Sequence, residues 1–458
     1  VSENGAPFFI QNNVFNRNYT GIEMRPYSGL TNTNDYSIAN NIFTSRNLPQ
    51  NAIPAANYTE SQLNGSTYPL TSFNPVNMKT PYTNQPGIYG VNFLNVNNAN
   101  PFQIGDTDLG NLFDEIKCGI NSKNSNLEIL KNTFQNQLFL NAGCIGCGAP
   151  NIHGIGVLAN VDNGATCSIT VDQNSFADIF QAVNVSRYAS TEVNRNIITN
   201  SITGNPSGGP LSPIIYGDAG IVVRPNNTNS VRIRSNKITN CATAIWLNRN
   251  TNYTGNNTIN IAGNKITANS SGYCTNGIEV TDYTSNNNTS SSSVINGNTI
   301  TQTVNGITLS FIKSAINISE NSCKVLYAAT GSRVGIKATG CKNLNIHNNH
   351  ISYNVGTAAL NTGNAAAYGI YLQKSTAMQV RCNLIEDAAT SLLFEGNCTS
   401  TRGITQNTMR RAQMGWELKN NGIVGTQGLS FFGFSIPANN YWDMSASHNF
   451  SVAQTLAY

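Results

Sequence analysis

The sequence predicts an all-β solenoid, a parallel β-helix in which short strands stack coil upon coil. Two recurring strand motifs and an unusual composition predict this fold. Only 10% of the residues are charged, whereas about a quarter is usual in globular domains. Asn, Ser, Thr and Gly take their place, and these residue types are poor helix formers. The low charge also argues against disorder, which needs high net charge and little hydrophobicity.

The first motif is a short alternating strand followed by an asparagine. It runs apolar, any residue, Ile or Val, two residues, Asn, any residue, apolar, as in Leu127-Ile129-Asn132-Phe134 and Leu344-Ile346-Asn349-Ile351. Alternation with period two is typical of a strand with one face in a core. The asparagine recurs in twelve clear or looser copies: Asn13, Asn41, Asn132, Asn174, Asn196, Asn236, Asn264, Asn298, Asn321, Asn349, Asn383 and Asn407.

The second motif is a Gly-Ile pair that opens another short strand, as in Gly277-Ile278-Glu279-Val280. Its apolar residue follows the motif asparagine by nine residues at Ile22, Ile245 and Ile307. The shortest return to the next asparagine is 13 residues, as from Ile336 to Asn349. The minimal coil is therefore 22 residues long, and longer gaps are loop insertions.

Such short strands cannot bury an apolar face alone, so successive copies must stack on one another. The asparagines then fall in register at a turn, where Asn tolerates left-handed backbone geometry. Neighbouring side-chain amides can donate and accept along the axis, which predicts an Asn ladder. A buried amide without partners costs roughly 1–3 kcal/mol, so the ladder must be continuous or capped.

The combined unit resembles the parallel β-helix repeats of the pectin-lyase-like superfamily, especially the NosD-type carbohydrate-binding and sugar-hydrolase repeats. The resemblance covers roughly residues 120–425 well and residues 5–45 fairly. It implies a right-handed helix, in agreement with the handedness of parallel connections. The sequence is similar in style to bacterial surface proteins, particularly those of Bacteroidota, so we expect a secreted, cell-surface protein. Such a repeat specifies fold more strongly than function.

Four segments are expected along the chain. Residues 1–45 carry two coils, and Val1 opens directly into a strand pattern, as in a mature protein or an excised fragment. Residues 46–118 are rich in Pro and Asn and predict a long insertion, in which Gly87-Ile88 and Gly90-Val91 allow one irregular coil. Residues 119–425 hold the regular β-helix. Residues 426–458 turn aromatic and either cap the core or begin a further domain.

Catalysis by a β-helix hydrolase would need two carboxyl groups roughly 5–9.5 Å apart. The outward residues of the Gly-Ile strands include no two adjacent carboxylates; in chain order they are Glu23, Asn184, Val222, Trp246, Glu279, Thr308, Lys337, Tyr371, Leu393 and Glu417. Two acid pairs remain conceivable, Glu279 with Asp282 and Glu395 with Glu417 on a diagonal. Solvated surface acids are the simpler interpretation, so the catalytic residues stay unassigned.

Ligand binding has a more specific set of candidates, Trp246, Tyr371 and Arg224, which share one outward face. Exposed aromatic rings flanked by Asn, Gln and Thr can stack on sugar rings and bond their hydroxyls, although scattered surface aromatics need no function. His347-x-x-His350 lacks a third ligand, and Cys144-x-x-Cys147 lacks a second pair at zinc spacing. We therefore expect no metal site and no cofactor, and a loop disulfide or free thiols for the cysteine pair.

The sequence favours a non-enzymatic extracellular surface module, either an adhesin stalk or a carbohydrate-binding solenoid. One alternative is a polysaccharide lyase or glycoside hydrolase whose site uses inserted loops, and another is a purely structural filament or spacer. Expected partners are a polysaccharide or another cell-surface component, within a larger surface assembly. The net charge of +4 is spread out, so nucleic acid is not an expected partner. No apolar run is long enough for a transmembrane helix.

Overall fold

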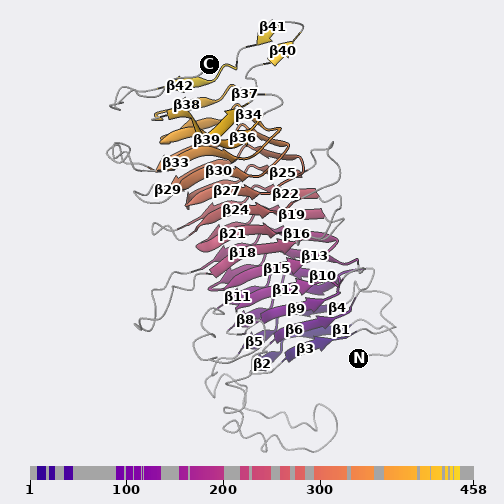
Figure 1. Cartoon of the computed structure of the whole chain (residues 1–458). Helices are drawn as coiled ribbons and strands as arrows, with labels where there is room; N and C mark the ends of the chain where they lie inside the picture. Colours follow the sequence, from indigo (N-terminus) through magenta and orange to yellow (C-terminus); the bar gives the residue numbers. More distant parts are fainter. Residues whose placement is uncertain are drawn as a thin grey trace, which may run out of the picture.

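The computed structural model describes residues 8–16, 20–25, 36–44, 89–96, 100–106, 108–114, 116, 118–135, 154–162, 166–200, 217–225, 230–248, 258–268, 274–283, 293–326, 332–354, 366–399, 403–412, 414–424, 429–431, 434–436 and 438–443. These residues form strands and turns, with no helix among them. Successive strands visit three parallel sheets in turn, so each coil adds one strand to each sheet (Figure 1). The predicted parallel β-helix is therefore confirmed.

We name the three sheets A, B and C in the order in which the chain first visits them. Sheet A has 13 strands: β1 (Phe8–Gln11), β4 (Tyr36–Ala39), β7 (Phe102–Ile104), β10 (Leu127–Leu130), β13 (Ser168–Asp172), β16 (Ser190–Asn194), β19 (Ser230–Arg234), β22 (Thr258–Ala262), β25 (Ser293–Asn296), β28 (Ile316–Ser319), β31 (Leu344–His347), β34 (Gln379–Arg381) and β37 (Ile404–Thr405).

Sheet B has 14 strands: β2 (Val14–Asn16), β5 (Ile42–Thr44), β8 (Leu112–Asp114), β11 (Thr133–Gln135), β14 (Ser175–Ala177), β17 (Ile197–Thr199), β20 (Lys237–Thr239), β23 (Lys265–Thr267), β26 (Thr299–Thr303), β29 (Ser322–Leu326), β32 (His350–Asn354), β35 (Leu384–Glu386), β38 (Thr408–Arg410) and β42 (Tyr441–Asp443).

Sheet C has 13 strands: β3 (Thr20–Met24), β6 (Tyr89–Leu94), β9 (Cys118–Lys123), β12 (Ile155–Asn160), β15 (Gln181–Ser186), β18 (Gly217–Arg224), β21 (Cys241–Asn248), β24 (Asn276–Thr281), β27 (Asn305–Ser310), β30 (Arg333–Thr339), β33 (Ala367–Gln373), β36 (Thr390–Cys398) and β39 (Met414–Val424). A separate antiparallel hairpin joins β40 (Leu429–Phe431) to β41 (Phe434–Ile436).

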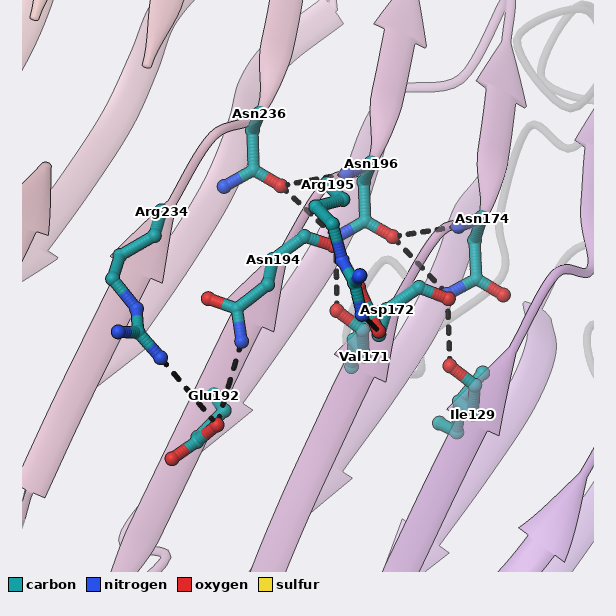
Figure 2. Close-up of polar contacts among 10 residues, drawn as sticks. All are labelled: Ile129, Val171, Asp172, Asn174, Glu192, Asn194, Arg195, Asn196, Arg234 and Asn236. Carbon is teal, nitrogen blue, oxygen red and sulfur yellow. Dashed lines mark hydrogen bonds and ion pairs between the residues drawn. The ribbon is translucent and has the colours of Figure 1, made fainter. Parts of the chain in front are cut away.

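The predicted Asn ladder runs along the whole described stack, at the turn between sheets A and B. In each step the side-chain Nδ2 donates to the Oδ1 of the asparagine in the next coil, at 2.8–3.1 Å. Figure 2 shows Asn174, Asn196 and Asn236 linked in this way, with Nδ2 also bonded to a carbonyl of the preceding coil. All twelve predicted asparagines take part, together with Asn111 and Asn440.

The turn geometry differs from the expectation in one respect. Left-handed backbone belongs to the residue before the ladder asparagine, as at Lys131 (φ 51°) and Arg195 (φ 52°), and not to the asparagine itself. The chain changes direction at that left-handed residue, and the asparagine after it can therefore point its side-chain amide into the stack. A left-handed non-Gly residue costs roughly 1–2 kcal/mol, which the ladder bonds of the adjacent amide offset.

Aromatic rings fill the centre of sheet B in the first five coils. The five rings form one continuous column, in which the centroids of neighbouring rings are 4.6–4.8 Å apart and their planes are nearly parallel. In chain order they are Phe15, Phe43, Phe113, Phe134 and Phe176. A glycine of sheet C lies against each of several rings. A Cβ built on Gly119 would lie 2.5 Å from the Phe134 ring, so the close approach needs glycine there. This contact explains why the second sequence motif begins with Gly.

The segment expected as an insertion contributes one coil to the stack, and Gly90-Val91 lies in the first strand of that coil. Strands β6, β7 and β8 all lie within residues 46–118, and they pair in regular parallel register with their neighbours. The ladder asparagine of this coil is Asn111, which follows Ile104 by seven residues instead of the usual three. A turn closed by the Asp106 N–H on the Leu109 carbonyl takes up the extra residues and hides the motif. Residues 45–88 lie outside the described residues.

The aromatic C-terminal segment adds a last strand to the stack. Strand β42 pairs with β38, which places Trp442 beside Met409 at the end of the sheet B core. Asn440 accepts from Asn407 at 2.9 Å and so extends the ladder. In the chain, the β40–β41 hairpin lies between β39 and β42 (Figure 1).

Candidate functional site

The outer face of sheet C carries the predicted column of outward residues. Trp246 pairs with Val222 on one side and Glu279 on the other, and the same register continues through Lys337 and Tyr371. Every second residue of these strands points outward because the side-chain period of a strand is two. The column is therefore a continuous row, with one side chain per coil.

A hollow of about 470 Å³ opens on this face over strands β6 to β18. Its lining combines side-chain amides, cations and two leucines: Leu94, Asn121, Ser122, Lys123, Leu158, Ala159, Asn160, Asn184, Ser186, Arg187, Arg224 and Pro225. A concave surface with a partly apolar floor and convergent polar groups is the usual form of a small-molecule site. The hollow is therefore a candidate site for a small ligand or part of a polymer.

Arg224 contacts both Asn184 and Trp246 at one end of the hollow. Its Nη1 donates to Asn184 Oδ1 at 2.8 Å, and its guanidinium carbon lies 5.8 Å from the centroid of the Trp246 ring. Asn184 Nδ2 in turn donates to Gln181 Oε1 at 2.7 Å. The structure thus brings together two of the three predicted ligand residues, Arg224 and Trp246, and links them to the amides of the hollow.

The charge of the hollow is positive. Lys123, Arg187 and Arg224 contribute cations, and no Asp or Glu occurs among the lining residues that the structure describes. Lys123 pairs with Asp162 at 3.1 Å just outside the lining. Hydrogen bonds from Asn124 and Lys123 lower the pKa of Asp162, so this carboxylate stays charged beside the lysine.

Tyr371, the third predicted ligand residue, lies apart from Arg224 and Trp246. Four coil steps separate it from Trp246, about 19 Å at the usual strand spacing. The Lys337 ammonium lies 5.5 Å from the centroid of its ring, and its hydroxyl donates to the Glu395 carboxylate. Burial and the bond to Glu395 both raise the pKa of Tyr371. Tyr371 therefore belongs to a second polar cluster on the same face.

Glu395 and Glu417, one of the two conceivable acid pairs, lie in this second cluster. They stand diagonally on adjacent coils, as the register shows, and both are bonded to other side chains. Glu395 accepts from Tyr371 and Asn420, which lower its pKa. Glu417 accepts from Thr390 at 3.0 Å and pairs with Lys419. A general acid needs a raised pKa, so Glu395 has the opposite of the required shift.

The second acid pair, Glu279 and Asp282, lies on a single coil. Glu279 accepts from Asn276 Nδ2 at 2.7 Å within its own strand, and Asp282 occupies the left-handed position of the following turn. The structure gives no contact between the two carboxylates and none from either to the hollow. Glu279 and Asp282 are therefore each held by their own strand and turn, and the geometry does not join them into an acid pair.

The two histidines of the His-x-x-His motif lie on different sheets. His347 belongs to β31 of sheet A, whereas His350 belongs to β32 of sheet B and contacts Glu386 at 2.8 Å. No group of three or more His, Cys, Asp and Glu side chains suited to a metal occurs in the described parts of the chain. Cys144 and Cys147 lie outside the described residues. The eight cysteines within them are all free thiols.

Sequence reasoning missed most of the hollow, including Lys123, Asn121, Leu158 and Arg187. The signal was present, because Gly119-Ile120-Asn121 and Gly156-Val157-Leu158 repeat the second motif. The long gaps on either side of these strands interrupt the regular coil spacing, which hides their outward residues in the sequence. The stacked structure restores them to the row that contains Asn184 and Trp246.

No helix in the described part of the chain is long and apolar enough to cross a membrane. Comparison of the chain with protein-family models, with curated proteins and with solved structures gave no match.

Proposed function

We propose that the chain is a non-enzymatic carbohydrate-binding solenoid of a secreted, cell-surface protein, and that the outer face of sheet C holds the glycan. One observation carries the proposal: Arg224 links the ring of Trp246 to the amide of Asn184 at the edge of a concave, amide-lined hollow. Sugars present hydroxyls that amides can bond and C–H faces that aromatic rings can cover. The resemblance of the repeat to NosD-type carbohydrate-binding repeats supports the same class of ligand.

The positive lining favours glycans that carry acidic groups. Arg224 offers a planar fork of donors that suits a carboxylate or a sulfate group, and Arg187 adds a second cation nearby. Leu94 and Leu158 supply apolar surface for the carbon side of a sugar ring. Because part of the attraction is between exposed charges, binding should weaken as salt rises.

The second cluster, around Tyr371, lies along the same face and extends the proposal to long chains. The distance of about 19 Å from Trp246 corresponds to several coils, so only an extended polysaccharide would reach both places. A short oligosaccharide would occupy the hollow alone. An adhesin stalk of this kind would hold a polymer along its axis.

The test is direct binding of the purified chain to a panel of matched acidic and neutral polysaccharides, measured by affinity electrophoresis and calorimetry. We expect binding to an acidic polymer, and about tenfold weaker binding after Arg224→Ala or Trp246→Ala, which corresponds to roughly 1.4 kcal/mol. Arg232→Ala is the matched control, because Arg232 lies on sheet A and pairs with Glu192 at 2.6 Å. Binding that is unchanged in both sheet C variants would remove the proposal.

The enzymatic alternative, a polysaccharide lyase or glycoside hydrolase, is distinguished in the same experiment. Release of reducing ends or unsaturated products from any polymer of the panel would favour it. Loss of that release in Glu395→Gln or Glu279→Gln would then locate the chemistry at one of the two acid pairs.

A further inference from the structure

Sheet C repeats one arrangement of side chains on its outer face: a cation, an aromatic ring and a carboxylate on three successive coils. The first set is Arg224 on β18, Trp246 on β21 and Glu279 on β24. The second set is Lys337 on β30, Tyr371 on β33 and Glu395 on β36. Adjacent strands of the sheet follow the order β18, β21, β24, β27, β30, β33 and β36. Each member of the first set therefore recurs in the second set after four coil steps.

In both sets the cation lies against the ring of the next coil. The guanidinium carbon of Arg224 is 5.8 Å from the centroid of the Trp246 ring. The ammonium of Lys337 is 5.5 Å from the centroid of the Tyr371 ring, and Lys337 forms no ion pair with a carboxylate among the described residues. Both rings are only partly buried. Because a ring attracts a cation without neutralising it, Lys337 keeps its positive charge on the outer face.

In both sets a carboxylate stands one coil beyond the ring. Glu279 is the in-register partner of Trp246. Glu395 lies two residues further along its strand than the partner of Tyr371, and it accepts a hydrogen bond from the Tyr371 hydroxyl. Each carboxylate also accepts from an asparagine side chain at 2.7 Å. A carboxylate has about four lone-pair sites, so both can still accept from the hydroxyls of a sugar.

A coil without an outward charge in this column separates the two sets. Its outward residue is Thr308, whose hydroxyl donates to Asn276 Oδ1 at 3.2 Å. Four coil steps correspond to about 19 Å at the usual strand spacing. The matching members are separated by different numbers of residues in the chain, because the loops between the coils differ in length. The equal spacing is therefore created by the stack and belongs to the face that a ligand would meet.

We propose that the two sets are subsites of one kind for a single acidic polysaccharide, in which two acidic groups lie about 19 Å apart. This inference rests on the proposed function and adds to it the number of subsites and the spacing of the acidic groups. At each subsite the cation binds an acidic group, the ring covers the carbon face of a sugar, and the carboxylate accepts from a hydroxyl. The first set adjoins the hollow, which Arg224 lines, so a short ligand binds there. A polymer that spans both sets gains the second subsite at high effective concentration.

The test is a length series of two acidic ligands, galacturonate oligomers and hyaluronate oligomers, titrated against the whole chain by calorimetry. In a series that binds, we expect one step of about tenfold or more in affinity, at the length that first spans about 19 Å. Lys337→Ala should remove this step and leave the affinity for shorter oligomers unchanged. Arg224→Ala should instead weaken the binding of short and long oligomers alike, because the hollow holds both.

Lys324→Ala is the matched control, because Lys324 is an exposed lysine on the outer face of β29 in sheet B and should leave the step in place. If Lys337→Ala fails to fold by circular dichroism, Lys337→Gln replaces it. A step that persists without the Lys337 charge, or an affinity that shows no step with length, would overturn the two-subsite proposal and leave glycan binding at the hollow standing. Binding to neither series would overturn both proposals together.

Discussion

Asn132 and Asn174 are 42 residues apart in the chain and one coil apart in space. The backbone N–H and Nδ2 of Asn132 both donate to Asn174 Oδ1, at 2.8 and 3.1 Å. The Nδ2 of Asn132 also donates to the Leu130 and Ile104 carbonyls at 2.9 Å. Each ladder amide therefore ties its own turn to the coils on both sides, and the stack depends on an unbroken series of these contacts.

Removing one amide from the middle of the ladder should strongly destabilise the solenoid. Asn264→Ala deprives the Asn236 backbone N–H and Nδ2 of their shared acceptor and the Ile233 carbonyl of a donor. Buried groups without partners cost roughly 1–3 kcal/mol each, so we expect a loss of about 3 kcal/mol in the free energy of unfolding. Urea denaturation followed by circular dichroism measures it. Asn260→Ala, on the outer face of β22, is the control and should cost about 0.5 kcal/mol or less.

Close packing of glycine against the phenylalanine column gives a second prediction. Gly119→Ala would place its Cβ 2.5 Å from the Phe134 ring and 2.7 Å from the Gly156 carbonyl. Overpacking of this kind should cost about 1–3 kcal/mol of stability. Phe134→Leu in the same background should recover part of the loss, and the coupling follows from a double-mutant cycle. Independent, additive effects of the two substitutions would contradict the packing account.

Thiol reactivity should separate buried from exposed cysteines. Burial raises the pKa of both Cys274 and Cys323 to about 12, so their reactive thiolates are scarce at neutral pH. Cys382 is exposed. We expect an alkylating reagent to modify Cys382 in the native protein, and Cys274 and Cys323 only after unfolding. Mass spectrometry of the individual peptides gives the readout, and early labelling of Cys323 would show that the core opens locally.

The Tyr371–Glu395 contact should make stability depend on pH in the acid range. Hydrogen bonds from Tyr371 and Asn420 lower the pKa of Glu395, so the unfolded chain binds this proton more readily than the folded chain. The contribution is present above the ordinary glutamate pKa and is lost as pH falls through the folded value. Tyr371→Phe removes the first of these bonds, which should raise the pKa of Glu395 and flatten the acid limb.

The check for this contact is an NMR titration of the Glu395 carboxyl in both proteins, with urea midpoints at about pH 7 and about pH 3.5 in support. Tyr368→Phe is the control, because the Tyr368 hydroxyl accepts from Lys419 and does not bond Glu395. The stability effect should be small, since Glu395 is only partly buried and solvent screens its charge. An identical titration in Tyr371→Phe would refute the assignment.

Local sequence determined the repeating unit of this protein. The step of three residues from Ile129 to Asn132 and the alternation around it lie within one strand and its turn. Short-range sterics and side-chain period therefore specify them without reference to other coils. For the same reason the twelve asparagines and the outward column of sheet C could be predicted. The motif does not identify Asn111, because four extra residues in its turn lengthen the spacing from Ile104.

The stacking of the coils decided which side chains from distant parts of the chain become neighbours. Arg224 touches Asn184 from 40 residues away, and the hollow joins Leu94 to Arg224 across several coils. Which side chains become neighbours in this way depends on the lengths of the loops between coils, and no local pattern contains those lengths. The separation of Tyr371 from Trp246 has the same origin, because it is a property of the assembled stack rather than of any single repeat.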